Sequence, residues 1–365
     1  MSDEIWVGLD VGLTTTAACI VDAVGSPIRE ESLPTSAAGI DTLLDAVGRE
    51  RVRAIGLEAG STSIYLARRL VRLGYDVAVF ECRQVATYLG LRQNKTDRND
   101  ARCIAEVART GRGFVSEVRL KTMEAQRIRS MLTMRDQFVR MRVAGEASVG
   151  SLLQLYGGKM KSSNSAIGLR RQVGAELTRL RDEEGIDLGA DVEAMVEMCE
   201  RMRVHVQGLD RAITAMAKEH PVCRRFLQIP GVGALTALSF YSAVDDPFRF
   251  KRSDDVGAYL GLVPRVRQSG GSRSYSRISK MGNTLTRYHL VAAAGVHLRA
   301  TSADTALKLW GTKVRERRGW GKARAAVARK LAVLMLTMWK QGSDFDPDFP
   351  SAAAGSAEPP ALLAS

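Results

Sequence analysis

The sequence has few of the residues that build zinc sites, disulfide frameworks or membrane spans. Its 365 residues include five cysteines, odd in number and without a CxxC pair, and four histidines without zinc-ligand spacing. The apolar run "LAVLMLTMW" is far shorter than a bilayer requires, and the opening Met-Ser-Asp-Glu does not resemble a signal peptide. We therefore expect a cytoplasmic protein with reduced cysteines, no membrane span, and oxygen ligands for any metal.

Acidic residues are nearly missing from one region of this basic chain. The net charge is +13, and residues 265–330 contain 16 lysines and arginines against only two acidic residues, Asp304 and Glu316. A merely solvated basic face usually has acidic residues interspersed. Their scarcity therefore favours a polyanionic partner, and we interpret it as nucleic acid.

The length predicts more than one domain, and the residue patterns change along the chain. In residues 1–112, apolar stretches typical of three successive strands are followed by strands that alternate with helices. This order predicts an α/β layer of the ribonuclease-H-like, RuvC-like type. Residues 346–365 are low in complexity, and we expect them to be disordered.

The remaining parts of the sequence have helical spacing. In residues 113–218, the segment "VEAMVEMCERMRVHVQGLDRAITAM" has apolar residues three or four apart, a near-heptad seam suited to a helical hairpin or coiled coil. This seam can serve the protomer itself or a partner subunit. Residues 219–345 are expected to be mainly α, and "FLQIPGVGALTALSF" is typical of a helix–hairpin–helix whose glycines let backbone N–H groups approach phosphate.

A carboxylate stands in the middle of the first hydrophobic hairpin, "WVGLDVGLTTTAACIVD", at Asp10. Actin-like kinases and ATPases use the turn after such an aspartate to cradle phosphate, whereas ribonuclease-H-like nucleases use the aspartate itself to hold a metal. A third alternative is a turn aspartate that only accepts hydrogen bonds from nearby backbone. The kinase alternative requires a second phosphate loop and an adenosine site, and neither is evident downstream.

Three further carboxylates favour the metal alternative. Glu58 ends a predicted strand, and "NKTDRNDA" supplies Asp97 and Asp100, which share one helical face just after a possible N-cap, Thr96. First-turn acids can simply suit the helix dipole. Together with Asp10, however, they predict a cage for Mg²⁺ or Mn²⁺ that stabilises the attacking and leaving oxygens of a phosphodiester displacement.

These motifs resemble a known family. "GLDVG", "GLEAGSTS" and "LRQNKTDRNDARCIAEVART" carry the four carboxylates and are similar to the DEDD motif of insertion-sequence transposases with a RuvC-like N-terminal domain. "IPGVGALTALSF" and "FKRSDDVGAYLGLVPRVRQSGGSRSYSRISKMGN" resemble the C-terminal transposase domain of the same family. The resemblance extends over about residues 5 to 342.

The resemblance implies a DNA recombinase that excises and inserts its own mobile element. Members are guided by a structured bridge RNA that pairs with double-stranded donor and target DNA, and their carboxylates bind Mg²⁺. A serine of the C-terminal domain is the nucleophile. The matching position here is Ser269, although Ser272, Ser274 and Ser276 lie nearby, so this assignment depends on the motif and not on spacing.

The family also implies a homo-oligomer, a dimer or tetramer in which the RuvC-like domain of one protomer faces Ser269 of another. Basic residues near both motifs are expected to contact nucleic acid: Arg92, Lys95, Arg98, Arg265, Arg267, Arg273, Arg277 and Lys280. Two other functions stay open from the residues. One is a hydrolytic RuvC-like nuclease of the Holliday-junction resolvase type, which uses only the carboxylates and water, and the other is a catalytically silent nucleic-acid-binding protein.

Overall fold

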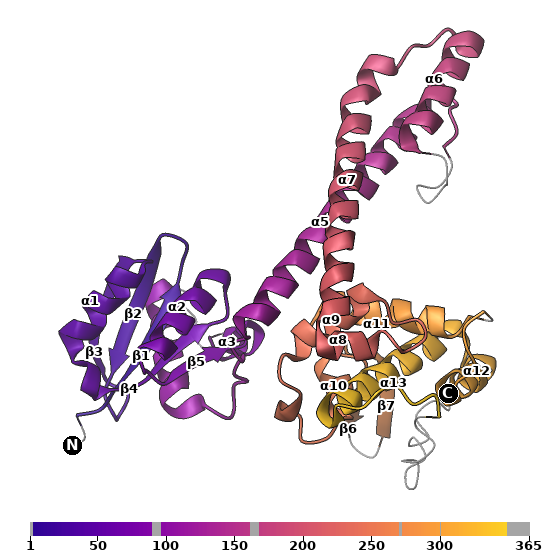
Figure 1. The fold of residues 1–365 in the computed structure, drawn as a ribbon. Coiled ribbons are helices and arrows are strands. Elements are labelled where there is room, and N and C mark those ends of the chain that lie inside the picture. The colour runs from indigo at the N-terminus through magenta and orange to yellow at the C-terminus, as the bar shows by residue number, and fades with distance from the viewer. Residues whose placement is uncertain (1–2, 90–95, 161–167, 270–271, 300, 349–365) are drawn as a thin grey trace. The chain divides into compact units, whose positions relative to one another are not determined.

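The computed structural model describes residues 3–89, 96–160, 168–269, 272–299 and 301–348, and for residues 88–89, 266–269 and 272–276 it describes the backbone alone. Contacts divide the chain into two compact units, Met1–Lys121 and Thr122–Ser365 (Figure 1). The central helices therefore belong to the same unit as the C-terminal region. The finer division at 112, 218 and 345 stays a prediction.

The N-terminal unit is built on a five-stranded mixed sheet. Its strands are β1 (Ile5–Val11), β2 (Thr15–Val21), β3 (Pro27–Pro34), β4 (Val52–Glu58) and β5 (Val77–Phe80). The order is β3-β2-β1-β4-β5, antiparallel from β3 to β1 and parallel from β1 to β5. A mixed sheet of this kind with helices on it is compatible with the RuvC-like fold that the strand order predicts.

Helices pack on both faces of this sheet. On one face, α1 (Ala37–Val47) and α2 (Ser61–Arg72) bury their apolar stripes against alternate residues of β1 and β4, such as Leu9 and Leu57. On the other face lie α4 (Asp97–Glu106) and a π-helical turn, Val107–Gly111. The glycines of the strands face α4, whereas the leucines face α1 and α2. The candidate site lies on the glycine face.

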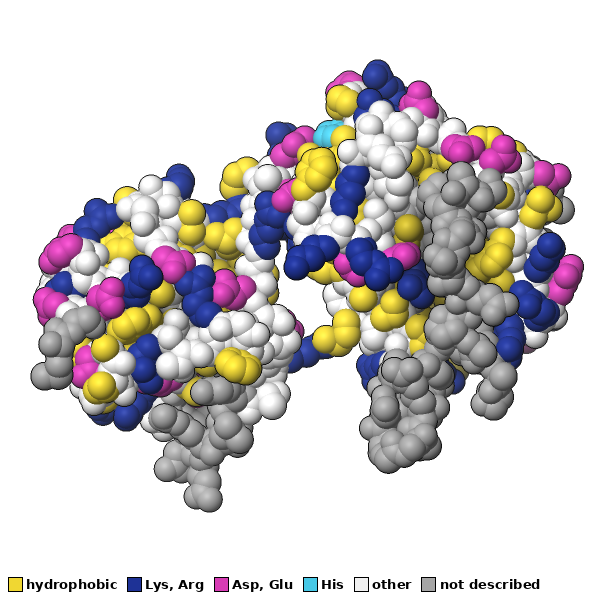
Figure 2. Space-filling view, turned by 90° about the horizontal axis from the view of Figure 1, so that it is seen from below, with side chains coloured by type: hydrophobic (Ala, Val, Ile, Leu, Met, Phe, Trp, Pro, Cys, Tyr) yellow, Lys and Arg dark blue, Asp and Glu magenta, His cyan; other side chains and the backbone are white. Residues whose placement is uncertain are grey.

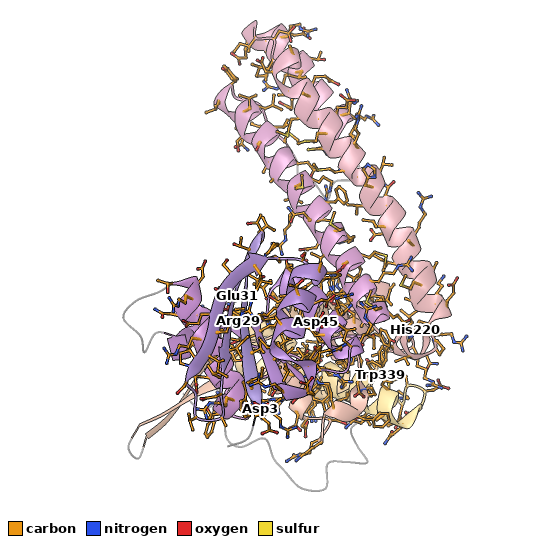
Figure 3. All side chains as sticks on the ribbon, turned by 90° about the vertical axis from the view of Figure 1, so that its left-hand side faces the viewer. Asp3, Arg29, Glu31, Asp45, His220 and Trp339 are labelled. Carbon is orange, nitrogen blue, oxygen red and sulfur yellow. The ribbon has the colours of Figure 1, made fainter. Side chains whose placement is uncertain are left out.

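The surface of the N-terminal unit is electrically mixed. Side chains of both signs are interspersed over it in the face shown at the left of Figure 2. On the exposed strand β3, Arg29 and Glu31 lie side by side and form an ion pair of 2.7 Å (Figure 3). The face drawn there has no excess of one sign to attract a polyanion.

Three long helices open the second unit. They are α5 (Met123–Leu155), α6 (Leu169–Glu184) and α7 (Gly189–Glu219). The helices α5 and α7 pack along each other (Figure 1), and Val192, Val196, Cys199 and Ile213 of the predicted seam are buried. Within this protomer the seam therefore packs α7 against its own chain.

The rest of the second unit is a cluster of helices around one large apolar core. Its helices are α8 (Pro221–Phe226), α9 (Ala234–Val244), η3 (Pro247–Arg249), α10 (Asp255–Tyr259), α11 (Thr284–His297), α12 (Ala306–Arg318) and α13 (Trp320–Gln341). Aromatic rings join its parts, and Tyr241 contacts both His220 and Trp339, whose places Figure 3 labels. Among the described residues, no helix is long and apolar enough to cross a membrane.

The C-terminal region also contains a β-hairpin that the helical expectation did not include. Strands β6 (Pro264–Ser269) and β7 (Ser272–Ile278) pair in antiparallel register. Part of the region expected to be mainly helical is therefore a two-stranded ribbon. The sequence of this hairpin contains few apolar residues, so it lacks the alternating pattern that predicts a strand.

Candidate active site

Two of the predicted carboxylates lie on neighbouring strands at the same height. Leu9 of β1 pairs with Leu57 of β4 in parallel register, so Asp10 and Glu58 are the next residue on each strand. Successive side chains of a strand point to opposite faces. Asp10 and Glu58 therefore share the face opposite to the leucines, and both are half-buried.

Glycines bring a helix close to that shared face. A Cβ at Gly8 would overlap the carbonyl oxygen of Ala101 and the backbone of Ala105, and a Cβ at Gly56 would lie 3.0 Å from the carbonyl oxygen of Ile104. Helix α4 thus runs directly over two strand positions that have no side chain. Any larger residue at Gly8 would push α4 away from the sheet.

Helix α4 presents the other two carboxylates at its first turn. Thr96 accepts a hydrogen bond from the N–H of Asn99 at 3.2 Å, which confirms the predicted N-cap. Asp97 and Asp100 precede the buried residues Ala101 and Ile104 by four residues and so lie on the same side of α4 as these two; Asp97 is exposed and Asp100 is half-buried.

The direction of α4 sets the end of the sheet that these acids approach. The last turn of α4 adjoins the turn between β2 and β3, because a Cβ at Gly25 would contact the carboxylate of Glu106. That turn follows Val21, which pairs with Trp6 near the start of β1. The first turn of α4 therefore lies toward the carboxyl end of β1, where Asp10 is.

The elements bring four carboxylates to one end and one face of the sheet, but the side chains do not close around a common point. Within the described ranges, no three His, Cys, Asp or Glu side chains are arranged to hold one metal ion together. The donor chemistry, four carboxylates without nitrogen or sulfur, fits a hard divalent cation. The predicted metal cage therefore stays a proposal.

One of the five cysteines, which the sequence does not connect with the carboxylates, also lies here. Because Glu58 pairs with Phe80 of β5, Cys82 at the start of α3 (Cys82–Leu89) comes next to Glu58. Its Sγ donates to the carbonyl oxygen of Ala59 at 2.7 Å. Burial, and then a hydrogen bond with Glu58, raise the pKa of the Cys82 thiol. No local signal in the sequence identifies this contact, since it depends on the pairing of β4 with β5.

Of the three basic residues expected near the carboxylates, the structure describes one, Arg98. Arg98 donates from Nε to Glu30 of β3 at 2.6 Å, and this hydrogen bond lowers the pKa of Glu30. The Arg98 side chain remains 74% exposed. Arg92 and Lys95 lie outside the described residues.

The candidate nucleophile belongs to the second unit. Ser269 is the last residue of β6 and pairs with Ser272, so its backbone stands at the tip of the hairpin. For Ser269, Arg267 and Arg273 the structure describes the backbone alone. At the base of the hairpin, Arg265 donates to the carbonyl oxygen of Ser279 at 3.0 Å.

The cations at the base of this hairpin are not neutralised by acids. Arg265, Arg277 and Lys280 are exposed, and none of the three forms an ion pair with a carboxylate of the described chain. The predicted role of Arg265, Arg267, Arg273, Arg277 and Lys280 in nucleic-acid contact stays a prediction. Their hairpin has the charge that such contact requires.

The Pro-Gly-Val-Gly turn joins α8 to α9, as the helix–hairpin–helix pattern predicts, but one glycine has another use. Gly231 has φ +87°, and a Cβ there would lie 2.8 Å from the carbonyl oxygen of Ala293 on α11. Gly231 therefore packs against a helix. His297 of α11 secures the same turn through Nδ1, which lies 2.6 Å from the carbonyl oxygen of Pro230.

Comparison with known proteins identifies relatives over both units. A family model for transposases of the IS110 DEDD type matches residues 7–157, and a second model, described as transposase IS116/IS110/IS902 family, matches residues 223–308. The chain is 31% identical to the transposase for insertion sequence element IS1111A of Coxiella burnetii over 341 residues, which cover 92% of this chain and 89% of that protein.

Two more distant relatives have the same kind of name. A probable family 20 transposase of Pseudomonas aeruginosa is 26% identical over 301 residues, 80% of this chain and 86% of that protein. The transposase for insertion sequence element IS1328 of Yersinia enterocolitica is 26% identical over 302 residues, 80% and 85% of the two chains. The similarity is therefore not confined to one motif or one unit.

Proposed function

The chain belongs to the IS110-type family of DEDD transposases, and from that premise we propose that it cuts and rejoins DNA by Mg²⁺-dependent phosphoryl transfer through a covalent intermediate on Ser269. The observation that carries the proposal is the shared placement of Asp10, Glu58, Asp97 and Asp100 at one end and face of the sheet. Each of the four comes from an element whose position is set by register or by glycine contact.

The four carboxylates would hold the metal ions, with Mn²⁺ as a substitute for Mg²⁺. When bound, such ions stabilise the charge that develops on the attacking and leaving oxygens. The half-buried Asp10 and Glu58 come from rigid strands, and Asp97 and Asp100 come from a capped helix start.

Ser269 would supply the attacking oxygen. Its Oγ forms a bond to the phosphorus, the bond to the sugar oxygen breaks, and the serine proton leaves to a base or solvent. The strand end departs as a hydroxyl. A hydroxyl of the new strand later attacks the phosphoserine and releases the serine, so the phosphodiester is rebuilt without an external energy source.

Guidance by a structured bridge RNA and a composite site in a dimer or tetramer complete the proposal. Both come from the family resemblance. The unpaired cations of the C-terminal unit support a polyanionic partner, and Ser269 and the carboxylates belong to different compact units of the chain. We also propose that the protein works in the cytoplasm on cellular DNA.

Trapping the covalent intermediate tests the chemistry. We expect the wild-type protein, purified together with the RNA from cells that carry the element and incubated with Mg²⁺ and DNA that carries the element's own ends, to form a protein–DNA adduct that survives denaturation. Ser269→Ala and Asp10→Asn should each abolish it, whereas the matched controls Ser272→Ala and Glu31→Gln should keep it. Nicking by Ser269→Ala without an adduct would instead identify a hydrolytic nuclease.

The same two inactive variants test the composite site and the RNA. If one protomer lends its carboxylates to another's serine, a mixture of Asp10→Asn and Ser269→Ala proteins regains adduct formation. A mixture that stays inactive contradicts sharing between protomers. Purification from cells that carry the element should also recover one enriched RNA from the element itself, and a random RNA population contradicts guidance.

A further inference from the structure

An exposed tryptophan stands at the junction of the last two helices. Trp320 is the first residue of α13 and is 40% exposed. Gly319 before it has φ +82°, a conformation that suits glycine and ends α12. An added Cβ at Gly319 or at Gly321 would contact nothing within 4 Å, so the backbone on both sides of the indole is open.

Two guanidinium groups lie against this indole. The Cζ of Arg315 is 5.0 Å from the ring centroid, and that of Arg324 is 6.0 Å from it. Arg324 is half-buried, with its Cδ 3.3 Å from the Cβ position of Gly295 on α11. Arg315 is exposed and comes from α12. One of the two cations is therefore held by packing, while the other is free to turn toward a ligand.

Further cations surround the tryptophan without carboxylate partners. Within ten residues of sequence, α12 and α13 add four more exposed cations: Lys313, Arg317, Arg318 and Lys322. In the described part of the chain, none of these four, and neither arginine at the indole, forms an ion pair with a carboxylate. The single acid among them, Glu316, is exposed and forms no ion pair with another described residue, so most of their mutual repulsion is left to solvent or to an anion that binds there.

The helix electrostatics point to the same conclusion. Arginines in the last turn of α12 suit the negative end of that helix. The start of α13 has the opposite arrangement, because its first turn contains no acidic residue and its N-cap, Gly319, provides no side-chain cap. Lys322 and Arg324 stand where helices favour anions. A phosphate group would accept hydrogen bonds from first-turn N–H groups, which have no partner within a helix, and would offset the charge of these cations.

We propose that Trp320 and its surrounding cations bind unpaired nucleotides of single-stranded nucleic acid. A base stacks on the indole, as bases do on aromatic residues in proteins that bind single strands, while the cations neutralise the flanking phosphates. This proposal rests on the proposed function, and it names a second contact site outside the serine hairpin. The stack accepts any base, so both an RNA loop and an opened DNA strand have the required chemistry.

Binding of labelled oligouridylate, oligothymidylate and a mixed-sequence DNA duplex to the full-length protein tests it. We expect Trp320→Ala to weaken the binding of at least one single strand about tenfold. The affinity for the duplex should stay unchanged, since paired bases are not available for stacking. Trp320→Phe keeps an aromatic ring and should keep most of the affinity. Phe114→Ala removes a ring that is 89% exposed in the other unit, and it is the matched control without an effect.

The two single strands separate the sources of the ligand. A loss confined to oligouridylate assigns the site to RNA, a loss confined to oligothymidylate assigns it to DNA, and an equal loss assigns it to either. Unchanged binding of both by Trp320→Ala, or an equal loss on the duplex, overturns the proposal. The proposed chemistry is tested separately by the covalent adduct: if wild-type protein forms no adduct, the chemistry fails, while the expected effect of Trp320→Ala on single-strand binding is unaffected.

Discussion

The arginines of the long helices and those of the last two helices have opposite surroundings. Along α5, α6 and α7, arginines pair with carboxylates of the same unit: Arg135 with Asp210, Arg142 and Arg203 with Glu146, Arg170 with Glu193 and Glu200, and Arg179 with Glu176 and Glu183. On α12 and at the start of α13, only Lys308 pairs with an acid, Asp304, among the described residues.

This difference shows that a basic residue count alone does not locate a binding surface. In the long helices these paired charges, some within one helix and some between neighbouring helices, cancel, so they send little field into solvent. In the C-terminal helices the charges add. The protein thus uses arginine for structure in one region and leaves it available to a polyanion in the other.

The largest expected effect is the loss of stability when the buried acid of the long helices is replaced. Glu146 is 5% exposed, and its Oε1 accepts from Arg142 at 2.6 Å and from Arg203 at 3.1 Å. Glu146→Ala leaves two partly buried cations without a partner and should lower the free energy of unfolding by about 3 kcal/mol. Urea unfolding followed by circular dichroism measures this loss.

The exposed Arg317 provides the control for that loss. Arg317→Ala removes a charge that pairs with no described acid, so the change in unfolding free energy should stay within about 0.5 kcal/mol. Equal losses in Glu146→Ala and Arg317→Ala would contradict the distinction between structural and available charge.

A smaller effect concerns buried histidine in the C-terminal helices, where an ionisable group is kept neutral instead of paired. Burial lowers the pKa of His289 to about 4, with Arg135 acting in the same direction and Asp136 against it. As the pH falls below about 6.5, His289 therefore takes up a proton in the unfolded chain but stays neutral in the folded chain. Stability is complete above that pH and is lost progressively toward pH 4.

The pH effect can be measured in the same unfolding assay. Between about pH 7.5 and about pH 5.5, His289 alone should cost about 1.4 kcal/mol. His289→Gln should remove that part of the pH dependence even if it changes the stability itself. His297 is also buried and its pKa is also lowered by burial, so a residual slope of the same sign should remain. A pH profile identical in wild type and His289→Gln contradicts the assignment.

How far the sequence predicts this molecule depends on whether the signal is local. The apolar strands, the capped helix at Thr96 and the buried seam from Val192 are periodic or chemically distinctive, and the structure confirms them. The hairpin that contains Ser269 is rich in serine, glycine and arginine, so no alternation of apolar residues identifies its strands. Short helix α3 lacks a comparable periodic stretch.

The candidate site shows the same limit. Two acids on adjacent strands and two on a helix can be expected at one end of a sheet from their order alone. The glycines that let α4 cross the strands, and the contact of Cys82 with Glu58, arise from tertiary pairing. Periodicity in one segment contains no information about which distant segment lies against it.

The smallest expected effect is on the salt dependence of DNA affinity, which should differ between the two classes of arginine. Arg317→Ala and Arg318→Ala together should reduce the slope of log affinity against log salt concentration by about 2 for duplex DNA, since each cation that neutralises a phosphate releases about one counterion. Arg170→Ala is the matched control, because its charge is already compensated by Glu193 and Glu200. It should leave the slope unchanged and lower stability by no more than about 1 kcal/mol. Equal salt slopes for both variants would mean that Arg317 and Arg318 do not contact phosphate. The two regions would then differ in ion pairing but not in nucleic-acid binding.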